Sequence, residues 1–276
     1  MRKPAKTLAL AGLLLAGPAF ARAAEPDVAD FLGQRGCVIG PGTLAEAEAE
    51  GITAAALEEF AARAVQMPGS RQTGEWLVVA PDLCSITFPL IESELTLDDP
   101  EVRASFSAVD AYAQHGDHGC FLDGDKLRSA LQDSRGWDAE RAFTAYLQLV
   151  GTGLQSGELA FHTDDPLRTP VGFALTTGIC GEVPGMDVIR EDHTLMMRHL
   201  DALIRDTATA VPCDEGASLM NMERPDFMTK ITDGRYRNAW GWLELMMMAM
   251  AADWYEGTSL TRKGQPRPPL CHIAEE

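Results

Sequence analysis

The sequence predicts a mainly helical α+β fold with small β-hairpins, built from three disulfide-closed helix–helix–hairpin units packed in series. Three observations predict it: regularly spaced cysteines, apolar residues that recur at helical spacing, and short extended stretches bounded by glycine and proline. The chain has 276 residues, of which 46% are hydrophobic. This length and composition allow a real core and exclude a collagen-like or disordered chain.

Residues 1–23 are predicted to be a secretory signal peptide. An uncharged Leu/Ala-rich stretch from Thr7 to Phe20 is followed by small-residue cleavage patterns that end at Ala21 and Ala23. The basic residues that precede this stretch are Arg2, Lys3 and Lys6. The apolar stretch is shorter than the ~20 residues that span a bilayer. We therefore expect a periplasmic or secreted protein, cleaved near Ala21 or Ala23, with no transmembrane segment after cleavage.

The acidic composition narrows the choice of partners. The formal net charge is −18, and cleavage after Ala23 would remove four basic residues and no acid, which gives −22. Nucleic acid is excluded as a partner because its phosphates would repel such a protein. The partner we expect is another exported protein.

Six cysteines lie beyond the signal peptide, and in an oxidising compartment an even count predicts a disulfide framework. They are Cys37, Cys84, Cys120, Cys180, Cys213 and Cys271. The closest two are 33 positions apart, so no C-x-x-C motif is present. This excludes a thioredoxin-type redox site, a zinc ribbon and covalent c-type haem attachment.

Internal similarity divides the chain into unit one (24–118), unit two (119–212) and a divergent unit three (213–276). Units one and two share a Gly-Cys start, a leucine seven positions after the cysteine, a glycine and then a helix N-cap residue. The Gly-Cys pairs begin at Gly36 and Gly119.

The elements of the first two units are predicted in the same order. Thr53 and Asp138 are helix N-caps, and apolar residues follow each at helical spacing. Extended stretches come next, at 76–80 and 86–88 in unit one and at 159–161 and 171–175 in unit two. A long helix then leads onward, from Asp99 in unit one and from about Asp187 to Thr207 in unit two. Unit three begins at Cys213 and contains a long helix after Asp233-Gly234.

The repeat predicts within-unit disulfides. The pairs Cys37–Cys84, Cys120–Cys180 and Cys213–Cys271 have separations of 47, 60 and 58. Closing loops of that size contributes roughly 3–4 kcal/mol each in the chain-entropy model. A rival set, Cys84–Cys120, Cys180–Cys213 and Cys37–Cys271, also respects the repeat.

Two groups of residues could bind a metal ion. His115, Asp117 and His118 offer imidazole and carboxylate ligands that suit zinc or copper. The alternative is a capped turn that leads into a structural cysteine. His193, Met197 and His199 lie on one predicted helix, where thioether and imidazole favour Cu(I). The alternative there is ordinary core packing. No other cofactor is expected.

Residues 239–254 form a Trp/Met-rich segment with two acids. A helix that is apolar nearly all round is buried or faces another apolar surface. Trp240, Trp242 and Trp254 could therefore anchor a partner, because tryptophan and methionine are enriched at interfaces. The alternative is a central core helix of unit three.

The chain lacks common catalytic motifs. H-E-x-x-H, G-x-S-x-G, the phosphate-binding G-x-x-x-x-G-K-[ST] and G-x-G-x-x-G are all absent. We therefore expect an exported, disulfide-stabilised binding or assembly protein. Two alternatives stay open: a copper- or zinc-handling protein that uses the His/Met clusters, and a hydrolase with an acidic site that the motifs do not reveal.

Overall fold

The computed structural model describes residues 27–107, 119–162, 172–210, 212–213 and 241–273. Within these ranges it contains nine α-helices, three small antiparallel sheets and three disulfides. The predicted α+β class with disulfide-closed units is confirmed. None of the helices in these ranges is long and apolar enough to cross a membrane.

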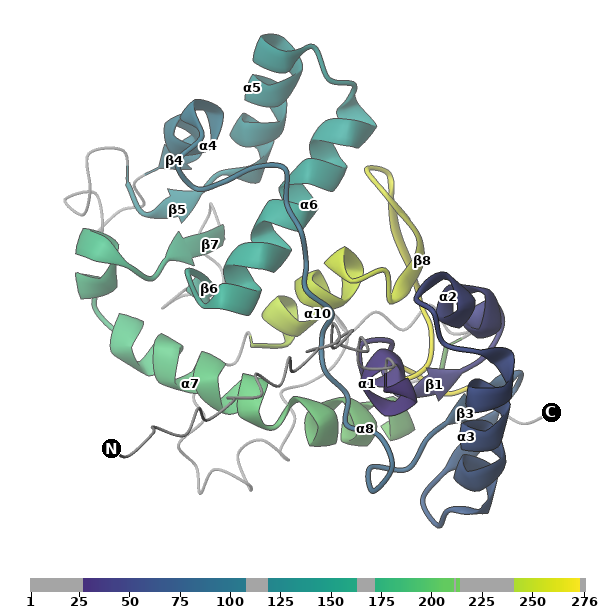
Figure 1. Ribbon diagram of the computed structural model, residues 1–276. Helices are drawn as coiled ribbons and strands as arrows, with labels where there is room; N and C mark the ends of the chain where they lie inside the picture. The colour runs from purple at the N-terminus through teal and green to yellow at the C-terminus, as the bar shows by residue number, and fades with distance from the viewer. Residues whose placement is uncertain (1–26, 108–118, 163–171, 211, 214–240, 274–276) are drawn as a thin grey trace, which may run out of the picture.

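Unit one combines three helices with a three-stranded sheet whose strand order is β1-β3-β2 (Figure 1). Its elements are α1 (Val28–Gly33), β1 (Val38–Ile39), α2 (Thr43–Ala49), α3 (Ala54–Gln66), β2 (Arg71–Thr73) and β3 (Trp76–Val78). The strand that follows Cys37 therefore pairs with the second strand of the hairpin. The backbone N–H of Val79 also donates to the carbonyl of Cys37 at 2.8 Å.

Unit two repeats this connection in a four-stranded sheet of order β4-β5-β7-β6, to which the end of unit one contributes β4. The elements up to this sheet's last strand are α4 (Pro100–Ser105), β4 (Phe106–Ser107), β5 (Phe121–Leu122), α5 (Gly124–Arg135), α6 (Ala139–Ser156), β6 (Leu159–His162) and β7 (Gly172–Leu175). Leu175 N–H donates to the Cys120 carbonyl at 2.9 Å, which matches the contact of Val79 with Cys37. The division of the chain into three domains stays a prediction.

The remaining elements complete unit two and build unit three. They are a 3₁₀ helix η2 (Gly178–Glu182), α7 (Met186–Arg198), α8 (Leu200–Ala210), α10 (Gly241–Ala251), β8 (Tyr255–Ser259) and β9 (Arg262–Pro266). In Figure 1, α10 lies at the centre of the molecule, and it contacts α6, β6, α7 and β8. One continuous core extends from Phe31 to Leu270 and draws residues from all three units.

Local sequence signals explain where the helices begin. Thr53 accepts from the N–H of Ala56 at 3.2 Å, and Asp138 accepts from the N–H of Arg141 at 2.7 Å, so both predicted N-caps are confirmed. Each bond satisfies a first-turn amide that has no partner within its helix.

The long helix predicted from Asp99 is wrong. α4 ends at Ser105, and the next two residues form β4, which pairs with β5. The Asp99 carboxylate does not cap the helix but accepts from the N–H of Thr96 at 2.6 Å. The helix expected over 187–207 is also divided, because His199 leaves the helical conformation between α7 and α8.

The three disulfides are the predicted within-unit pairs, and the rival set is wrong. Cys37–Cys84, Cys120–Cys180 and Cys213–Cys271 have Cα–Cα distances of 5.7, 5.5 and 5.1 Å. All of these distances are ordinary for a disulfide. Each bond therefore closes its own unit, and packing must hold the units together.

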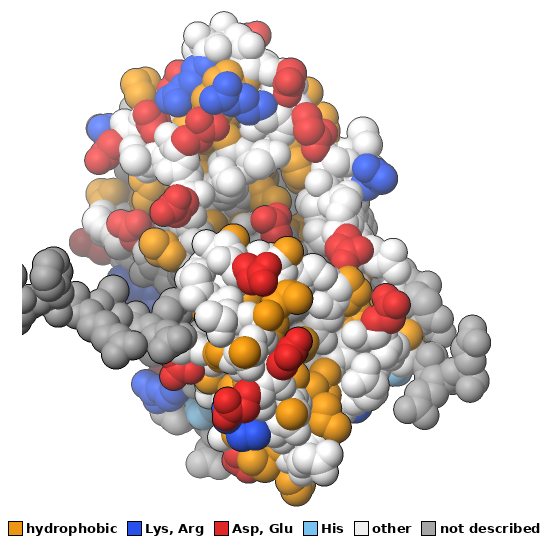
Figure 2. Space-filling view, turned by 45° about the vertical axis from the view of Figure 1, so that its right-hand side comes forward, with side chains coloured by type: hydrophobic (Ala, Val, Ile, Leu, Met, Phe, Trp, Pro, Cys, Tyr) orange, Lys and Arg blue, Asp and Glu red, His pale blue; other side chains and the backbone are white. Residues whose placement is uncertain are grey.

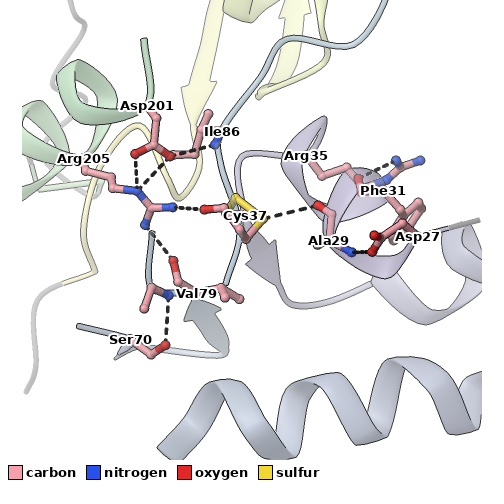
Figure 3. Close-up of a disulfide and its surroundings, with 12 residues drawn as sticks. Asp27, Ala29, Phe31, Arg35, Cys37, Ser70, Val79, Ile86, Asp201 and Arg205 are labelled. Carbon is pink, nitrogen blue, oxygen red and sulfur yellow. Dashed lines mark hydrogen bonds and ion pairs between the residues drawn. A yellow bond between two sulfur atoms is a disulfide. The ribbon is translucent and has the colours of Figure 1, made fainter. Parts of the chain in front are cut away.

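A half-buried guanidinium joins unit two to the loop that contains Cys84 (Figure 3). Arg205 on α8 donates to the carbonyls of Val79 at 2.6 Å and Cys84 at 2.9 Å. Its Nε is 3.0 Å from both carboxylate oxygens of Asp201, and Asp201 accepts from the N–H of Ile86 at 2.7 Å. The pair thus satisfies three backbone groups of a segment that has no regular secondary structure.

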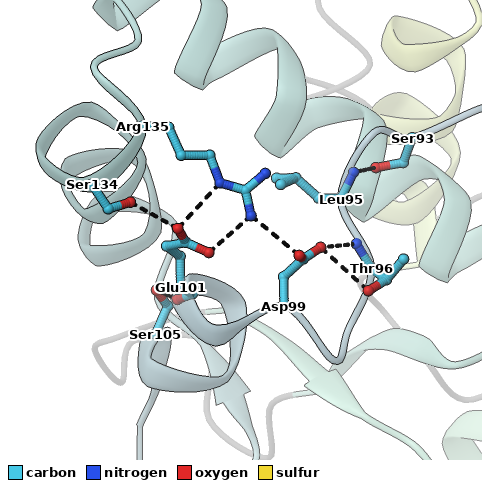
Figure 4. A network of polar contacts seen from close by, with 8 residues as sticks. All are labelled: Ser93, Leu95, Thr96, Asp99, Glu101, Ser105, Ser134 and Arg135. Carbon is cyan, nitrogen blue, oxygen red and sulfur yellow. Dashed lines mark hydrogen bonds and ion pairs between the residues drawn. The ribbon is translucent and has the colours of Figure 1, made fainter.

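A second ion-pair network fastens α4 to α5 (Figure 4). The Arg135 guanidinium lies 2.8 Å from Glu101 and 3.1 Å from Asp99, and the Ser134 hydroxyl donates to Glu101 at 2.8 Å. Hydrogen bonds from Arg135 and then Ser134 lower the pKa of Glu101 to about 2.

Replacing Arg205 with Ala should lower the free energy of unfolding by about 3 kcal/mol, because two carbonyls and a carboxylate lose a charged donor. Arg205→Lys keeps the charge but not the planar set of donors, so its free energy of unfolding should lie between those of wild type and Arg205→Ala. Urea denaturation measures both. A loss below about 0.5 kcal/mol, as at an ordinary surface position, would contradict this role.

The Glu101 network should make stability depend on pH. Because the pKa of Glu101 is lower in the folded protein, its contribution is present above the ordinary value of 4.5 and is lost as pH falls toward about 2. Glu101→Gln should therefore be less stable than wild type at pH 6, and the two should converge near pH 2. Urea unfolding midpoints of both proteins, measured from pH 6 to pH 2, test this prediction. A difference between the two proteins that stays constant at every pH would contradict it.

Candidate functional site

The predicted metal ligands do not come together in the part of the chain that the structure describes. His115, Asp117 and His118 lie outside the described residues. Met197 is half-buried against the core, and His199 is the C-cap of α7. The described residues hold no group of three or more His, Cys, Asp or Glu side chains arranged for a metal ion. Copper or zinc binding stays a prediction.

The Trp/Met-rich segment matches its core interpretation. Trp254 is 1% exposed, stacks on Phe88 with ring centroids 4.7 Å apart, and donates from Nε1 to the Gln34 carbonyl at 3.3 Å. Trp242 is half-buried against the core, and Trp240 lies outside the described residues. Partner binding by these tryptophans is untested, and a buried Trp254 offers no surface for it.

A cavity of about 430 Å³ opens where unit one meets the end of α10. Its walls come from the residues that follow α1, from α2, from Trp76 at the start of β3, and from the α10–β8 connection. Trp76 and six charged residues determine its chemistry. The charged residues are Arg35, Glu46, Glu50, Asp253, Glu256 and Arg267. A concave site with a few convergent polar groups is the ordinary form of a ligand pocket.

The positive charge of Arg35 is paired with two carboxylates of the protein. Its Nε lies 2.7 Å from Glu46, and its Nη2 lies 2.8 Å from Glu50. The guanidinium also packs over the Phe31 ring, with Cζ 3.9 Å from the centroid. This cation therefore serves to hold α1 and α2 together.

Arg267 differs from Arg35, because no carboxylate of the described residues lies within ion-pair distance of it. Its Nη1 donates to the carbonyls of Pro268 at 3.0 Å and Arg35 at 3.5 Å. The side chain is half-buried, and burial lowers the pKa of its guanidinium below the ordinary value. The cavity thus contains a positive charge that forms no ion pair with the described part of the protein, although Glu46, Glu256 and Asp253 lie near enough to favour its charged form.

Trp76 forms a fixed aromatic wall. Its ring lies so close to Gly40 that a Cβ there would come within 2.3 Å of Cε3, so Gly40 is required for the approach. The Arg267 Cζ is 5.4 Å from the ring centroid, within range of a cation–π contact.

The rim of the cavity is acidic. Asp253 and Glu256 are exposed, and neither forms an ion pair with a described residue. Asp253 has a φ of 58° in the turn after α10, and both Asp253 and Glu256 line the cavity. On the face of the molecule that Figure 2 shows, acidic side chains are widely spread and Lys and Arg side chains are fewer.

A second site surrounds Glu244, the single ionisable residue of α10. Its side chain is fully buried. One carboxylate oxygen accepts from the N–H of Phe161 at 2.8 Å, and the other lies 2.8 Å from Nδ1 of His193 on α7. The His193 side chain is 11% exposed, so its ring reaches from the core to a small cavity.

This second cavity has a volume of about 240 Å³. Its lining residues are Ser156, Gly157, Ala160, Thr176, Arg190, His193 and Thr194. A Cβ placed on Gly157 would lie 3.8 Å from His193 Nε2, which puts that nitrogen at the cavity wall. Arg190 is exposed at the mouth and donates from Nη1 to the Thr176 carbonyl at 3.1 Å.

Sequence reasoning found His193 but missed Glu244 and Arg267 as functional groups. Glu244 carries a visible signal, because an acid inside an apolar helix must find partners when the helix is buried. Arg267 carries none, since nothing along the chain indicates which carboxylates lie near it.

Comparison with protein-family models, curated proteins and solved structures finds no match to this chain.

Proposed function

We propose that the protein is an exported binding protein and that the 430 Å³ cavity receives a small zwitterion with an apolar side chain, such as a hydrophobic amino acid. The observation that carries the proposal is Arg267, a half-buried cation without a carboxylate partner among the described residues. Burying an unpaired charge costs free energy, so a ligand that supplies the missing anion is favoured.

A carboxylate is the best match for the guanidinium. Nη1 is occupied by two carbonyls, while Nε and Nη2 donate no hydrogen bond to the described residues. A planar fork of donors suits a carboxylate, and a charge-assisted hydrogen bond is worth about 1.5–3 kcal/mol. Arg267 thus supports recognition of a ligand's carboxylate end.

The rest of the cavity favours a cationic group and an apolar side chain on the same ligand. Asp253 and Glu256 at the rim would attract an ammonium group. Trp76 supplies a rigid ring against which an apolar or aromatic side chain can pack. A doubly charged anion would gain from Arg267 but would be repelled by the acidic rim.

Export is part of the proposal. The three disulfides fit an oxidising compartment, and the predicted signal peptide at 1–23 gives the route. The proposed ligand is therefore one that occurs outside the cytosol.

Isothermal titration of the purified protein tests the ligand class, with phenylalanine as the probe. We expect a Kd below 1 mM, or about −4 kcal/mol. Phenylalaninamide lacks the carboxylate and N-acetylphenylalanine lacks the ammonium, so each should bind at least tenfold more weakly. Absence of phenylalanine binding, or equal affinity for the three compounds, would contradict the proposal.

Arg267→Gln should weaken phenylalanine binding at least tenfold, because the amide cannot replace a charged fork. The matched control is Arg262→Gln, which removes an exposed arginine at the start of β9, outside the cavity lining. This control should bind like wild type. Thermal melting of both variants shows whether each is folded, and equal affinity of a folded Arg267→Gln would refute the role of this residue.

A further inference from the structure

We propose that His193 is the general base of an ester-hydrolysing site in the 240 Å³ cavity, positioned by Glu244 and assisted by Arg190. This site is separate from the Arg267 cavity and does not depend on the ligand proposed there. Its substrate class is a carboxylic ester with a small acyl group, because the cavity is smaller than the roughly 300–1,000 Å³ of ordinary ligand pockets.

The burial of Glu244 determines the tautomer of His193. A buried carboxylate accepts hydrogen bonds, and one of its oxygens already accepts from the N–H of Phe161. The contact of 2.8 Å to Nδ1 therefore places the imidazole proton on Nδ1. The lone pair on Nε2 is left available at the cavity wall, as proton abstraction requires.

Water is the nucleophile that the cavity favours. The hydroxyls of Ser156, Thr176 and Thr194 donate to backbone carbonyls at 3.1, 2.6 and 2.8 Å. Their protons are therefore directed away from His193, and none of these groups is hydrogen-bonded to the imidazole. The protons of a water bound beside Nε2 would not be held by these carbonyls, so the water could donate to Nε2.

Arg190 supplies the positive charge that the intermediate needs. It forms no ion pair with a described carboxylate, and its contact with the Thr176 carbonyl uses Nη1 and leaves other donors at the mouth. A charged donor directed at a developing oxyanion is worth about 10²–10³ in rate.

The reaction balances without a co-reactant. Nε2 of His193 takes a proton from water as the water oxygen bonds to the ester carbon, and the carbonyl electron pair moves to the oxygen beside Arg190. The tetrahedral intermediate then collapses, and the bond to the alcohol oxygen breaks. The imidazolium returns its proton to that oxygen, which releases an acid and an alcohol and regenerates neutral His193.

The test is hydrolysis of p-nitrophenyl acetate by the full chain, compared with His193→Asn. Asparagine can still donate to Glu244 from its amide while Nε2 is lost, so the buried carboxylate keeps a partner. We expect the rate to fall by about 10²–10⁴, the usual contribution of a general base. His272→Gln controls for non-specific reaction of imidazoles with this ester and should match wild type. His272 lies near the C-terminus, where it contacts Ala208 and does not line the cavity.

Glu244→Gln tests the positioning role. The glutamine oxygen can accept from Phe161, but its NH₂ would face Nδ1 and force the imidazole proton onto Nε2. We expect kcat to fall at least 100-fold with KM and the melting temperature little changed, as loss of the correct tautomer predicts. A purely structural role would instead lower the melting temperature and leave kcat of the folded fraction unchanged.

The solvent isotope effect is measured on wild type alone, so this test does not depend on the folding of any variant. Rate-limiting abstraction of a water proton should make hydrolysis slower in D₂O. The proposal is overturned if wild type hydrolyses the ester no faster than His193→Asn, if His272→Gln loses activity equally, or if no isotope effect is found.

Discussion

The burial of α10 is the constraint on which the rest of the structure depends. This helix has apolar side chains on nearly every face and packs against α6, β6, α7 and β8 at the centre of the molecule. Each disulfide closes its own unit, so contacts between the units hold them together, and the core around α10 draws residues from all three. Glu244, carried into that core, can be accommodated only because Phe161 and His193 satisfy it.

The arginines show how structural and functional charges differ in this protein. Arg205 and Arg135 are surrounded by carboxylates and carbonyls of the described residues, which uses their donors to join segments. Arg267 and Arg190 each bind backbone carbonyls but have no described carboxylate partner, and each lines a cavity. Charge that the fold leaves uncompensated beside a cavity is available to a ligand.

Local signals allowed much of the fold to be predicted. Capping residues such as Thr53 and Asp138 fix helix starts through contacts three residues away, and the internal repeat favoured the disulfide set that the structure contains over one rival set. The prediction failed where a distant segment decides the outcome. α4 ends at Ser105, before the predicted long helix is complete, because the next two residues form β4 and pair with β5, where Phe106 lies opposite Leu122.

The candidate sites were less accessible from sequence for the same physical reason. His193 and Glu244 are 51 positions apart, and Glu244 and Phe161 are 83 apart, so no motif connects them. Arg267 meets Trp76 and the carbonyl of Arg35 across still longer intervals. Such pairings are set by packing around α10 and are not encoded by spacing.

The disulfide connectivity bears on how the chain is made. The first cysteine bonds to the second, the third to the fourth and the fifth to the sixth. A polypeptide that enters an oxidising compartment from its N-terminus presents each cysteine to its native partner before the next pair emerges. Joining every new thiol to the nearest unpaired predecessor therefore yields the native set. Maturation by this route requires an oxidant but no reshuffling of bonds by an isomerase.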